Sequence, residues 1–200
     1  MVEASIDAIE RTWVPASKTA TATSLAKTGL IDRASCDNAA KQTYGVLDVG
    51  CATGHTMLAL LKRRFAHVFG VDSSSHMLEA CSRNLQSAGY TKEAHDQLRL
   101  DATFPQDRFF ASKDLGAVIA NWTLHFITNR AARAEYLRAI HEALVPGGCL
   151  VLTEKTSQDA VTRSMYHAWK QEPPRNVSGP EIAAKAHSLR GVLKPLPVAW

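Results

Sequence analysis

A short apolar run, a turn with two glycines and the start of a helix follow one another between residues 45 and 54. The run Gly-Val-Leu-Asp-Val at 45–49 has a strand pattern, and apolar residues recur at helical spacing over 56–64. Between them, Gly50 permits a tight turn that a ligand can approach closely, and Gly54 lets the helix begin near the strand. The exposed N–H groups of such a helix start suit a ligand carboxylate or phosphate.

Strand and helix patterns alternate along the rest of the chain. Further strands are predicted at 67–71, 97–100, 117–120 and 149–153, and helices at 75–88 and 129–144, the latter ended by Pro-Gly-Gly at 146–148. The strand runs are apolar throughout, as in parallel strands that are covered on both faces. Right-handed crossovers place all strand C-termini along one edge, where ligands of such sheets bind. The sequence predicts an α/β fold with a doubly wound, mostly parallel sheet.

Length and composition fit one such domain. The 200 residues are 46% hydrophobic, which provides a sizeable core. Residues 1–43 are predicted to be an N-terminal extension, partly helical or mobile, with a short helix over 5–13 capped by Ser5. Residues 44–200 form the binding domain, whose part 156–200 is helical. No apolar run is long enough to span a bilayer, and the N-terminus lacks the pattern of a secretory signal.

Cysteine usage and charge disfavour several classes of protein. Cys36, Cys51, Cys81 and Cys149 form no Cys-x-x-Cys pair and join no histidine cluster, so no metal site and no disulfide framework is expected. A reducing, cytoplasmic setting fits best. The net charge of +4 is too small to indicate a nucleic-acid binder, and no phosphate-binding P-loop occurs.

An aspartate stands at the end of each of the first three strands. Asp72 lies 22 residues after Gly50, where a carboxylate takes both hydroxyls of a ribose. Asp101 ends the third strand, where its side chain and the adjacent backbone bracket an adenine. Each aspartate alone has an alternative as a helix cap or turn former. Together with Asp48 and the glycine turn, they favour a nucleoside site. A dehydrogenase is the weaker alternative, because an acid directly before the glycines is atypical for dinucleotide binding.

This constellation resembles the Rossmann-like class I S-adenosylmethionine-dependent methyltransferases. In that family the strand-end acid and glycine turn hold the methionine part of the cofactor, the second acid takes the ribose and the third region the adenine. The resemblance implies S-adenosyl-L-methionine as the cofactor. The cofactor-binding residues expected here are Asp48, Gly50, Cys51, Ala52, Gly54, Asp72, Ser73, Asp101, Ala102, Asn121 and Trp122.

Two later segments resemble the carboxy-S-adenosylmethionine synthase subfamily more closely. They are Asn-Trp-Thr-Leu-His-Phe-Ile at 121–127 and Leu-Val-Pro-Gly-Gly-Cys-Leu-Val-Leu-Thr-Glu-Lys at 144–155, and similarity continues through 165–170 and 181–185. That family joins the carboxyl group of prephenate to the cofactor methyl, and the product serves modification of a tRNA wobble uridine. The resemblance also implies a dimer. Three features depart from it. Ala186 replaces an arginine that holds the carboxyl, His125 replaces a glutamine, and the residues before Tyr44 do not match.

Several polar and aromatic residues after the fourth and fifth strands are candidates for chemistry. Asn121 follows the fourth strand directly and is expected nearest the methyl, with a turn-forming asparagine as the alternative. Trp122 walls the cofactor or packs in the core, and His125 is a base or a structural histidine. Lys155 is a candidate cation for a substrate anion or a solvated lysine. Arg190 lies one helical turn from Ala186 and is a candidate replacement for the missing cation.

The expected function is an S-adenosylmethionine-dependent one-carbon transfer that resembles carboxy-S-adenosylmethionine synthesis. The alternatives are a methyltransferase acting on an unknown small molecule or tRNA-related substrate, and a non-catalytic S-adenosylmethionine-binding module. The expected partners are a small molecule such as prephenate and a second copy in a homodimer, without a membrane or direct contact with nucleic acid.

The methyltransferase fold that the chain resembles has seven strands, the last two forming an antiparallel hairpin. Five strands precede Thr156, and helices are expected over 156–170 and 180–193, the second with Pro180 in its first turn. The sequence therefore predicts a chain that is truncated relative to its relatives and lacks this hairpin. The fourth or fifth strand is then expected to expose an edge.

Overall fold

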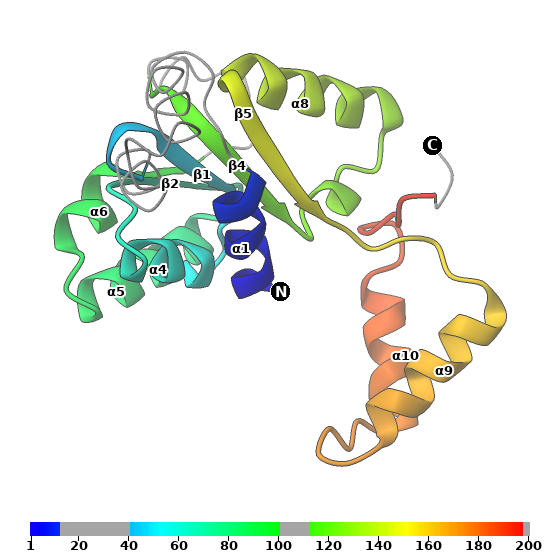
Figure 1. Cartoon of the computed structure of the whole chain (residues 1–200). Coiled ribbons are helices and arrows are strands. Elements are labelled where there is room, and N and C mark those ends of the chain that lie inside the picture. The colour runs from blue at the N-terminus through cyan, green and yellow to red at the C-terminus, as the bar shows by residue number, and fades with distance from the viewer. Residues whose placement is uncertain (13–40, 101–112, 198–200) are drawn as a thin grey trace. The chain divides into compact units, whose positions relative to one another are not determined.

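The computed structural model describes residues 1–12, 41–100 and 113–197, and these contain one parallel sheet (Figure 1). The sheet has five strands in the order β3-β2-β1-β4-β5. Each strand pairs in parallel with its neighbours. The strands are β1 (Gly45–Val49), β2 (His67–Asp72), β3 (Leu98–Leu100), β4 (Leu115–Asn121) and β5 (Leu144–Thr153). The predicted parallel α/β sheet is confirmed.

The chain divides into two compact units, which are described separately. The first unit comprises Met1–Asn121 and Ala134–Thr153 and contains the sheet. The second unit comprises Trp122–Arg133 and Glu154–Trp200. It contains a short 3-10 turn, η1 (Leu124–Phe126), and the helices α9 (Ala160–Gln171) and α10 (Gly179–Ser188).

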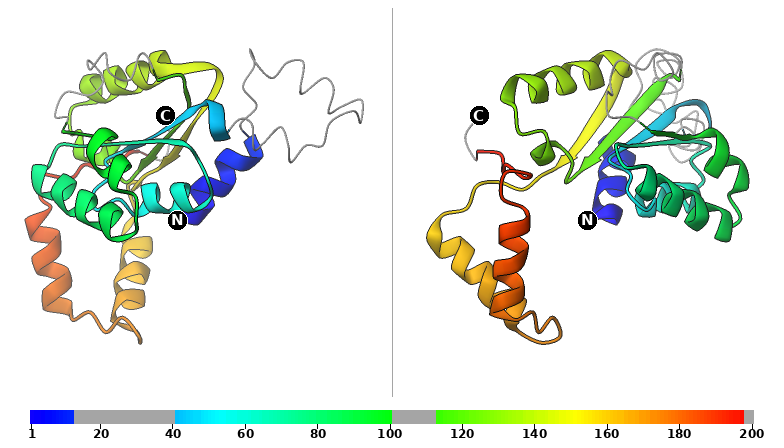
Figure 2. Two further views of the ribbon diagram at one scale, coloured as in Figure 1. Left: turned by 90° about the vertical axis from the view of Figure 1, so that its left-hand side faces the viewer. Right: turned by 180° about the vertical axis from the view of Figure 1, so that it is seen from behind.

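Helices cover both faces of the sheet (Figure 2). One face carries α1 (Val2–Thr12), α4 (His55–Lys62) and α5 (Ser75–Ser87), and the other carries α8 (Arg130–Ala143). Alternate strand residues supply the two cores, since side chains along a strand point to opposite faces. Val46 packs in the core beneath α1 and α4, whereas Leu47 packs in the core with Ile140 of α8. This arrangement is the predicted doubly wound one.

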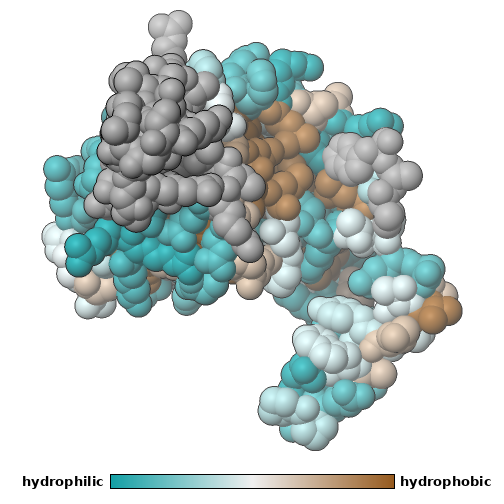
Figure 3. Space-filling view, viewed as in Figure 1, coloured by the Kyte–Doolittle hydropathy of each residue, from teal (hydrophilic) through white to brown (hydrophobic). Residues whose placement is uncertain are grey.

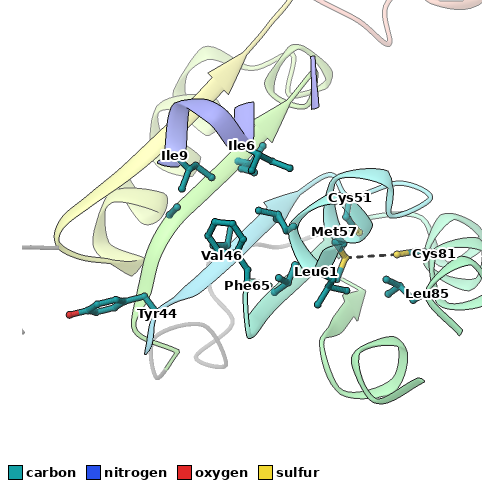
Figure 4. Close-up of a cluster of buried hydrophobic side chains, with 14 of the residues drawn as sticks. Ile6, Ile9, Tyr44, Val46, Cys51, Met57, Leu61, Phe65, Cys81 and Leu85 are labelled. Atoms are coloured by element: carbon teal, nitrogen blue, oxygen red, sulfur yellow. Dashed lines mark hydrogen bonds between the residues drawn. The ribbon is translucent and has the colours of Figure 1, made fainter. Parts of the chain in front are cut away.

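The larger core joins α1 to the sheet and to α4 (Figure 4). Ile6 and Ile9 of α1 are completely buried. Phe65 and Met57 continue the same core toward α5. Burying a side chain of this size contributes about 1.5–3 kcal/mol, so residues of the N-terminal segment contribute to the stability of the sheet domain.

Ion pairs hold the polar side of α1. The Arg63 guanidinium at the end of α4 pairs with Glu3, with Asp7 at 2.7 Å and with Glu10 at 3.1 Å. Lys41 pairs with Glu10 at 2.6 Å. One cation shared among three carboxylates on successive turns fixes how α1 lies along α4, although exposed ion pairs add little to stability.

The Pro-Gly-Gly segment corrects one predicted boundary. It was expected to separate helix 129–144 from strand 149–153, but β5 already begins at Leu144 and passes through it. Leu144 pairs with Leu115 and Cys149 with Ala117, so residues 145–148 lie opposite a single residue of β4. The segment therefore forms a bulge in which Gly147 has a φ of 82°. Pairing with β4 sets this boundary.

Other predicted boundaries shift because of capping. Ser5 lies inside α1 and does not cap it, and its N–H donates to the Met1 carbonyl. Asp159 caps α9, which begins four residues later than expected, and Ser178 forms a capping box with Glu181 at α10. Pro180 stands in the first turn of α10 as predicted. The helix α6 (Thr91–Asp96) was not predicted, because its six residues are mostly polar.

The last strand of the sheet has one unpaired edge within the described residues. No strand pairs with β5 on the side away from β4, and no antiparallel hairpin occurs in residues 41–100 or 113–197. Leu152 is 40% exposed, and Figure 3 shows hydrophobic surface over β5 beside α8. The prediction that the fifth strand exposes an edge is confirmed for this part of the chain.

Replacing Gly70 with alanine is expected to destabilise the fold by about 1–3 kcal/mol, because it overpacks a buried site. A Cβ at Gly70 in β2 would lie 2.5 Å from Met57 Sδ and 3.0 Å from Cys51 Sγ. Urea unfolding measures the loss. Gly179→Ala is the control, because its nearest neighbour lies 3.7 Å away. Equal unfolding midpoints for wild type and Gly70→Ala would show that the packing is not tight.

Candidate functional site

The turn after β1 holds three residues in the left-handed backbone region. Gly50 has a φ of 71°, Ala52 of 46° and Gly54 of 84°. The N–H groups of Gly50 and Cys51 both donate to the carbonyl of Val71, at 2.8 and 2.9 Å. These bonds fasten the turn to the end of β2. To form both bonds the backbone turns sharply at residues 50 and 51. Glycine at position 50 adopts the left-handed φ of this turn without strain.

Asp72 connects this turn to α5. Its Oδ2 accepts the N–H of Ala52 at 3.0 Å, and its Oδ1 accepts the N–H of Ser74, the N-cap of α5, at 2.9 Å. A carboxylate oxygen has two lone pairs, so each oxygen keeps capacity for a further donor. Asp72 is half-buried and the neighbouring Ser73 is exposed. The structure thus brings Asp72 and Ser73 beside the glycine turn.

The start of α4 faces the turn with an uncapped backbone. Gly54 is the N-cap residue of α4 and supplies no capping side chain. The first N–H groups of a helix have no intrahelical acceptor, so they suit an anionic group of a ligand. The expected reason for Gly54 needs a correction. A Cβ there would lie 2.5 Å from Cys81 Sγ of α5, so Gly54 allows α5 to approach. Gly70 in β2 permits close packing of Met57 and Cys51 against the strand.

Asp48 and Cys51, at the end of β1 and the start of the turn, are both buried. Asp48 is 2% exposed, and burial raises its pKa to about 7, while a hydrogen bond with the Thr56 side chain acts in the opposite direction. Nearby Asp72 raises the pKa of Asp48 further. Cys51 is 4% exposed and lies in the larger core. In this structure Asp48 thus interacts with Thr56 in the first turn of α4, and Cys51 packs in the core.

Asn121 ends β4 at the same edge of the sheet. The preceding residue, Ala120, pairs with Val49 at the end of β1. The Ser5 hydroxyl of α1 donates to Asn121 Oδ1 at 3.1 Å. The sequence analysis did not identify this contact, since no motif links residues 116 positions apart. We call Gly50, Ala52, Gly54, Asp72 and Asn121, which all belong to the first unit, the strand-end site.

Trp122 and Lys155 form a separate group in the second unit. Trp122 is 50% exposed, so the core-packing alternative does not apply, and its φ of 57° is unusual for a large side chain. The Lys155 ammonium lies 5.6 Å from the centre of the Trp122 ring, an attractive cation–aromatic contact. Arg190 lies just beyond α10 and is exposed. Together Trp122 and Lys155 present a flat ring and a positive charge.

His125 takes part in a buried hydrogen-bond network. It is 1% exposed, and its Nδ1 lies 2.5 Å from Oε2 of Glu154. Glu154 also accepts the N–H groups of Thr123 at 2.8 Å and Leu124 at 2.5 Å. The geometry favours the structural alternative for His125, because the pair holds η1 in place. Sequence reasoning missed Glu154, although an acid directly after a strand was an available signal.

Two predicted adenine contacts, Asp101 and Ala102, lie outside the described residues, as does Cys36. In the parts of the chain that the structure describes, no three histidine, cysteine or acidic side chains gather as metal ligands would. None of the helices in these parts is long and apolar enough to cross a membrane.

The fold and the strand-end site define a class that comparison with known proteins identifies. The methyltransferase domain family matches residues 46–148, which include all but the first residue of β1, the glycine turn, Asp72 and Asn121. The chain belongs to this family, and its cofactor is S-adenosyl-L-methionine.

Curated relatives of the chain share one name. Carboxy-S-adenosyl-L-methionine synthase of Desulfotalea psychrophila is 38% identical over 164 residues, covering 78% of this chain and 63% of that protein. The protein of the same name from Trichodesmium erythraeum is 32% identical over 157 residues, covering 76% and 59%. The chain thus spans less than two thirds of the length of these relatives.

One solved structure similar to the chain is the sugar N-methyltransferase KedS8 from Streptoalloteichus. It is 25% identical, with a TM-score of 0.47, over 57% of this chain and 42% of that one.

We expect stability to depend on pH through Asp48. Burial raises the pKa of its carboxyl to about 7 in the fold, from an ordinary value of 3.8. Between these values the folded state binds more protons than the unfolded chain, so the free energy of unfolding falls as pH rises. Asp48→Asn removes this dependence. Its stability relative to wild type should therefore increase by about 2–3 kcal/mol from pH 5 to pH 8.

Urea unfolding at pH 5, 6, 7 and 8 measures this difference. Glu79→Gln, which removes an exposed carboxylate on α5, should show the same pH dependence as wild type. A constant difference between Asp48→Asn and wild type across the range would contradict the assignment.

Proposed function

We propose that the chain binds S-adenosyl-L-methionine at the strand-end site and catalyses a one-carbon transfer at the cofactor methyl. The transferred group is either the methyl itself or a carboxyl group that becomes attached to it. The observation that carries this proposal is the position of Asp72. Asp72 is the last residue of β2, the strand next to β1. Its carboxylate accepts the N–H of Ala52 in the turn and keeps lone pairs for further donors. A ligand with two hydroxyls and an anionic end matches these groups.

Each part of the site is assigned a ligand group of matching chemistry. The backbone of the glycine turn and the uncapped start of α4 take the methionine carboxylate. Asp72 accepts the two ribose hydroxyls through its remaining lone pairs. Asn121, at the end of β4, lies nearest the methyl. The assignment of the adenine to Asp101 and Ala102 stays a prediction.

The bound cofactor supplies a sulfonium whose methyl is already activated. For methyl transfer the protein therefore has to align the reacting groups and exclude water, and no strong base is required. Carboxyl transfer additionally requires that a methyl proton leave as the new C–C bond forms. The requirement for methyl transfer agrees with the burial of His125, which serves the fold of η1. Trp122 and Lys155 carry a flat ring and a cation, chemistry that suits a cyclic, anionic substrate such as prephenate.

Carboxyl transfer is proposed to be slow in this chain. Capture of a carboxyl beside the sulfonium needs a cation, and the resembling family has an arginine where this chain has Ala186 on α10. Lys185 precedes it, and exposed Arg190 follows one turn later. The tRNA context and the homodimer that the resemblance implies belong to the same proposal. A reducing, cytoplasmic setting is also proposed, since Cys51, Cys81 and Cys149 are free thiols.

Replacing Asp72 tests the cofactor assignment. Asp72→Ala should weaken S-adenosyl-L-methionine binding by about 1–3 kcal/mol, because it removes the acceptor for buried donors. Isothermal titration calorimetry measures the affinity, and Asp96→Ala, which changes an exposed acid at the end of α6, is the matched control. Unchanged affinity for Asp72→Ala would rule out the ribose assignment. Absence of binding to wild type would reject the proposed function itself.

Ala186→Arg tests the carboxyl-transfer proposal. Wild type supplied with S-adenosyl-L-methionine and prephenate should form little carboxylated cofactor, as measured by mass spectrometry. Restoring the cation should raise the rate about tenfold, the effect of one charged hydrogen bond. Ala184→Arg, which adds the same charge to an exposed site on α10, should not. A fast wild-type reaction that Ala186→Arg leaves unchanged would contradict the proposal.

Turnover separates the enzyme from the binding-module alternative. The non-catalytic alternative would be favoured if wild type and Ala186→Arg both bind S-adenosyl-L-methionine but neither forms a methylated or carboxylated product.

A further inference from the structure

We propose that Ser5 of α1 is a positioning residue of the strand-end site and acts through Asn121. The inference rests on the proposed function, because it assigns a role beside the cofactor to a segment outside the matched methyltransferase domain. The contact joins Ser5, which precedes the matched residues 46–148, to Asn121 within them.

The hydrogen bond between Ser5 and Asn121 is partly buried and joins residues far apart in the sequence. Ser5 is 3% exposed, and its Oγ donates to Asn121 Oδ1 at 3.1 Å. A serine hydroxyl inside a helix often bonds to its own helix backbone, whereas this one reaches a strand end 116 residues away. Buried polar groups of this kind are held by their partners, so this bond restricts both side chains.

The bond determines how the amide of Asn121 is oriented. The terminal torsion of asparagine is broad and roughly two-fold, so the two ends of the amide exchange places at little cost when nothing holds them. A donor fixed on Oδ1 keeps the carbonyl oxygen toward α1 and the amino group away from it. Asn121 is thereby pre-organised before a ligand binds, which lowers the ordering cost of binding.

Ser5 is itself held firmly by the packing of α1. Ile6, directly next to it, and Ile9 are fully buried in the larger core. On the polar side, Arg63 pairs with Glu3, Asp7 and Glu10. Arg63 is the C-cap of α4, and the N-cap of the same helix is Gly54 of the glycine turn. The helix α1 therefore contacts both α4 and the end of β4. These contacts hold the Ser5 hydroxyl in place beside Asn121.

An isosteric pair at position 5 isolates the hydroxyl. Threonine keeps the hydroxyl and valine lacks it, while both have the same branched shape.

Affinity for S-adenosyl-L-methionine is measured by calorimetry for wild type, Ser5→Thr, Ser5→Val and Ser5→Ala. Ser5→Val and Ser5→Ala should each weaken binding about fivefold to tenfold, the effect of one hydrogen bond. Ser5→Thr should bind nearly as well as wild type. Ser188→Ala, which removes a hydroxyl from α10, should bind like wild type.

A double-mutant cycle tests whether Ser5 acts through Asn121. Asn121→Ala alone should weaken binding, and Ser5→Val should have no further effect in that background. The inference would be overturned if Ser5→Thr and Ser5→Val bind S-adenosyl-L-methionine with equal affinity. It would also be overturned if Ser5→Val weakens binding as much in the Asn121→Ala background as in wild type. Wild type that fails to bind S-adenosyl-L-methionine would instead reject the proposed function. These outcomes distinguish the two proposals.

Discussion

The attachment of the glycine turn to the end of β2 is the interaction on which the rest of the site depends. Two backbone N–H groups donate to the carbonyl of Val71, and Asp72 holds Ala52 from the next position. The same carboxylate accepts the N–H of Ser74 where α5 begins. One strand end thus fixes the turn, the start of α4 and the start of α5. A site assembled from so many backbone groups needs few ligand-contacting side chains.

The charges near this turn have unequal environments. Asp72 is half-buried and its oxygens accept backbone N–H groups, whereas Asp48 is enclosed and interacts with Thr56. Two carboxylates close together raise the cost of ionising the more buried one. Asp72 therefore carries the negative charge at the edge where a sulfonium ligand is proposed to bind, whereas Asp48 keeps its proton up to about pH 7. The stability of the fold and the electrostatics of the site are therefore linked through the same pair of residues.

The sequence predicted the sheet well because its strands are covered on both faces. Strands buried in this way are apolar throughout, as the runs around Val46, Val68 and Leu150 are, and such runs are easily located. The positions of Asp72 and Asn121 followed from the rule that parallel strands end along one edge. Asp48 shows the limit of that rule. It shares the parity of Val46 along β1, so its side chain faces the α4 side of the sheet.

Features that depend on distant partners were not predictable from local patterns. The bulge at Pro146–Gly148 exists because β5 pairs with β4 on both sides of it. Ser5 looked like a helix cap, since serine is common there, and its contact with Asn121 depends on how α1 packs. The closeness of Gly54 to Cys81 likewise results from helix packing, which spacing along the chain does not encode.

The network around Glu154 has a mechanical consequence for the second unit. Glu154 binds the backbone of Thr123 and Leu124 and the ring of His125, and its chain neighbour is Lys155. Trp122 directly precedes the segment that Glu154 holds. Through these bonds Glu154 ties the backbone next to Trp122 to the backbone next to Lys155. The distance between the indole and the ammonium therefore depends on Glu154 as well as on their own contact.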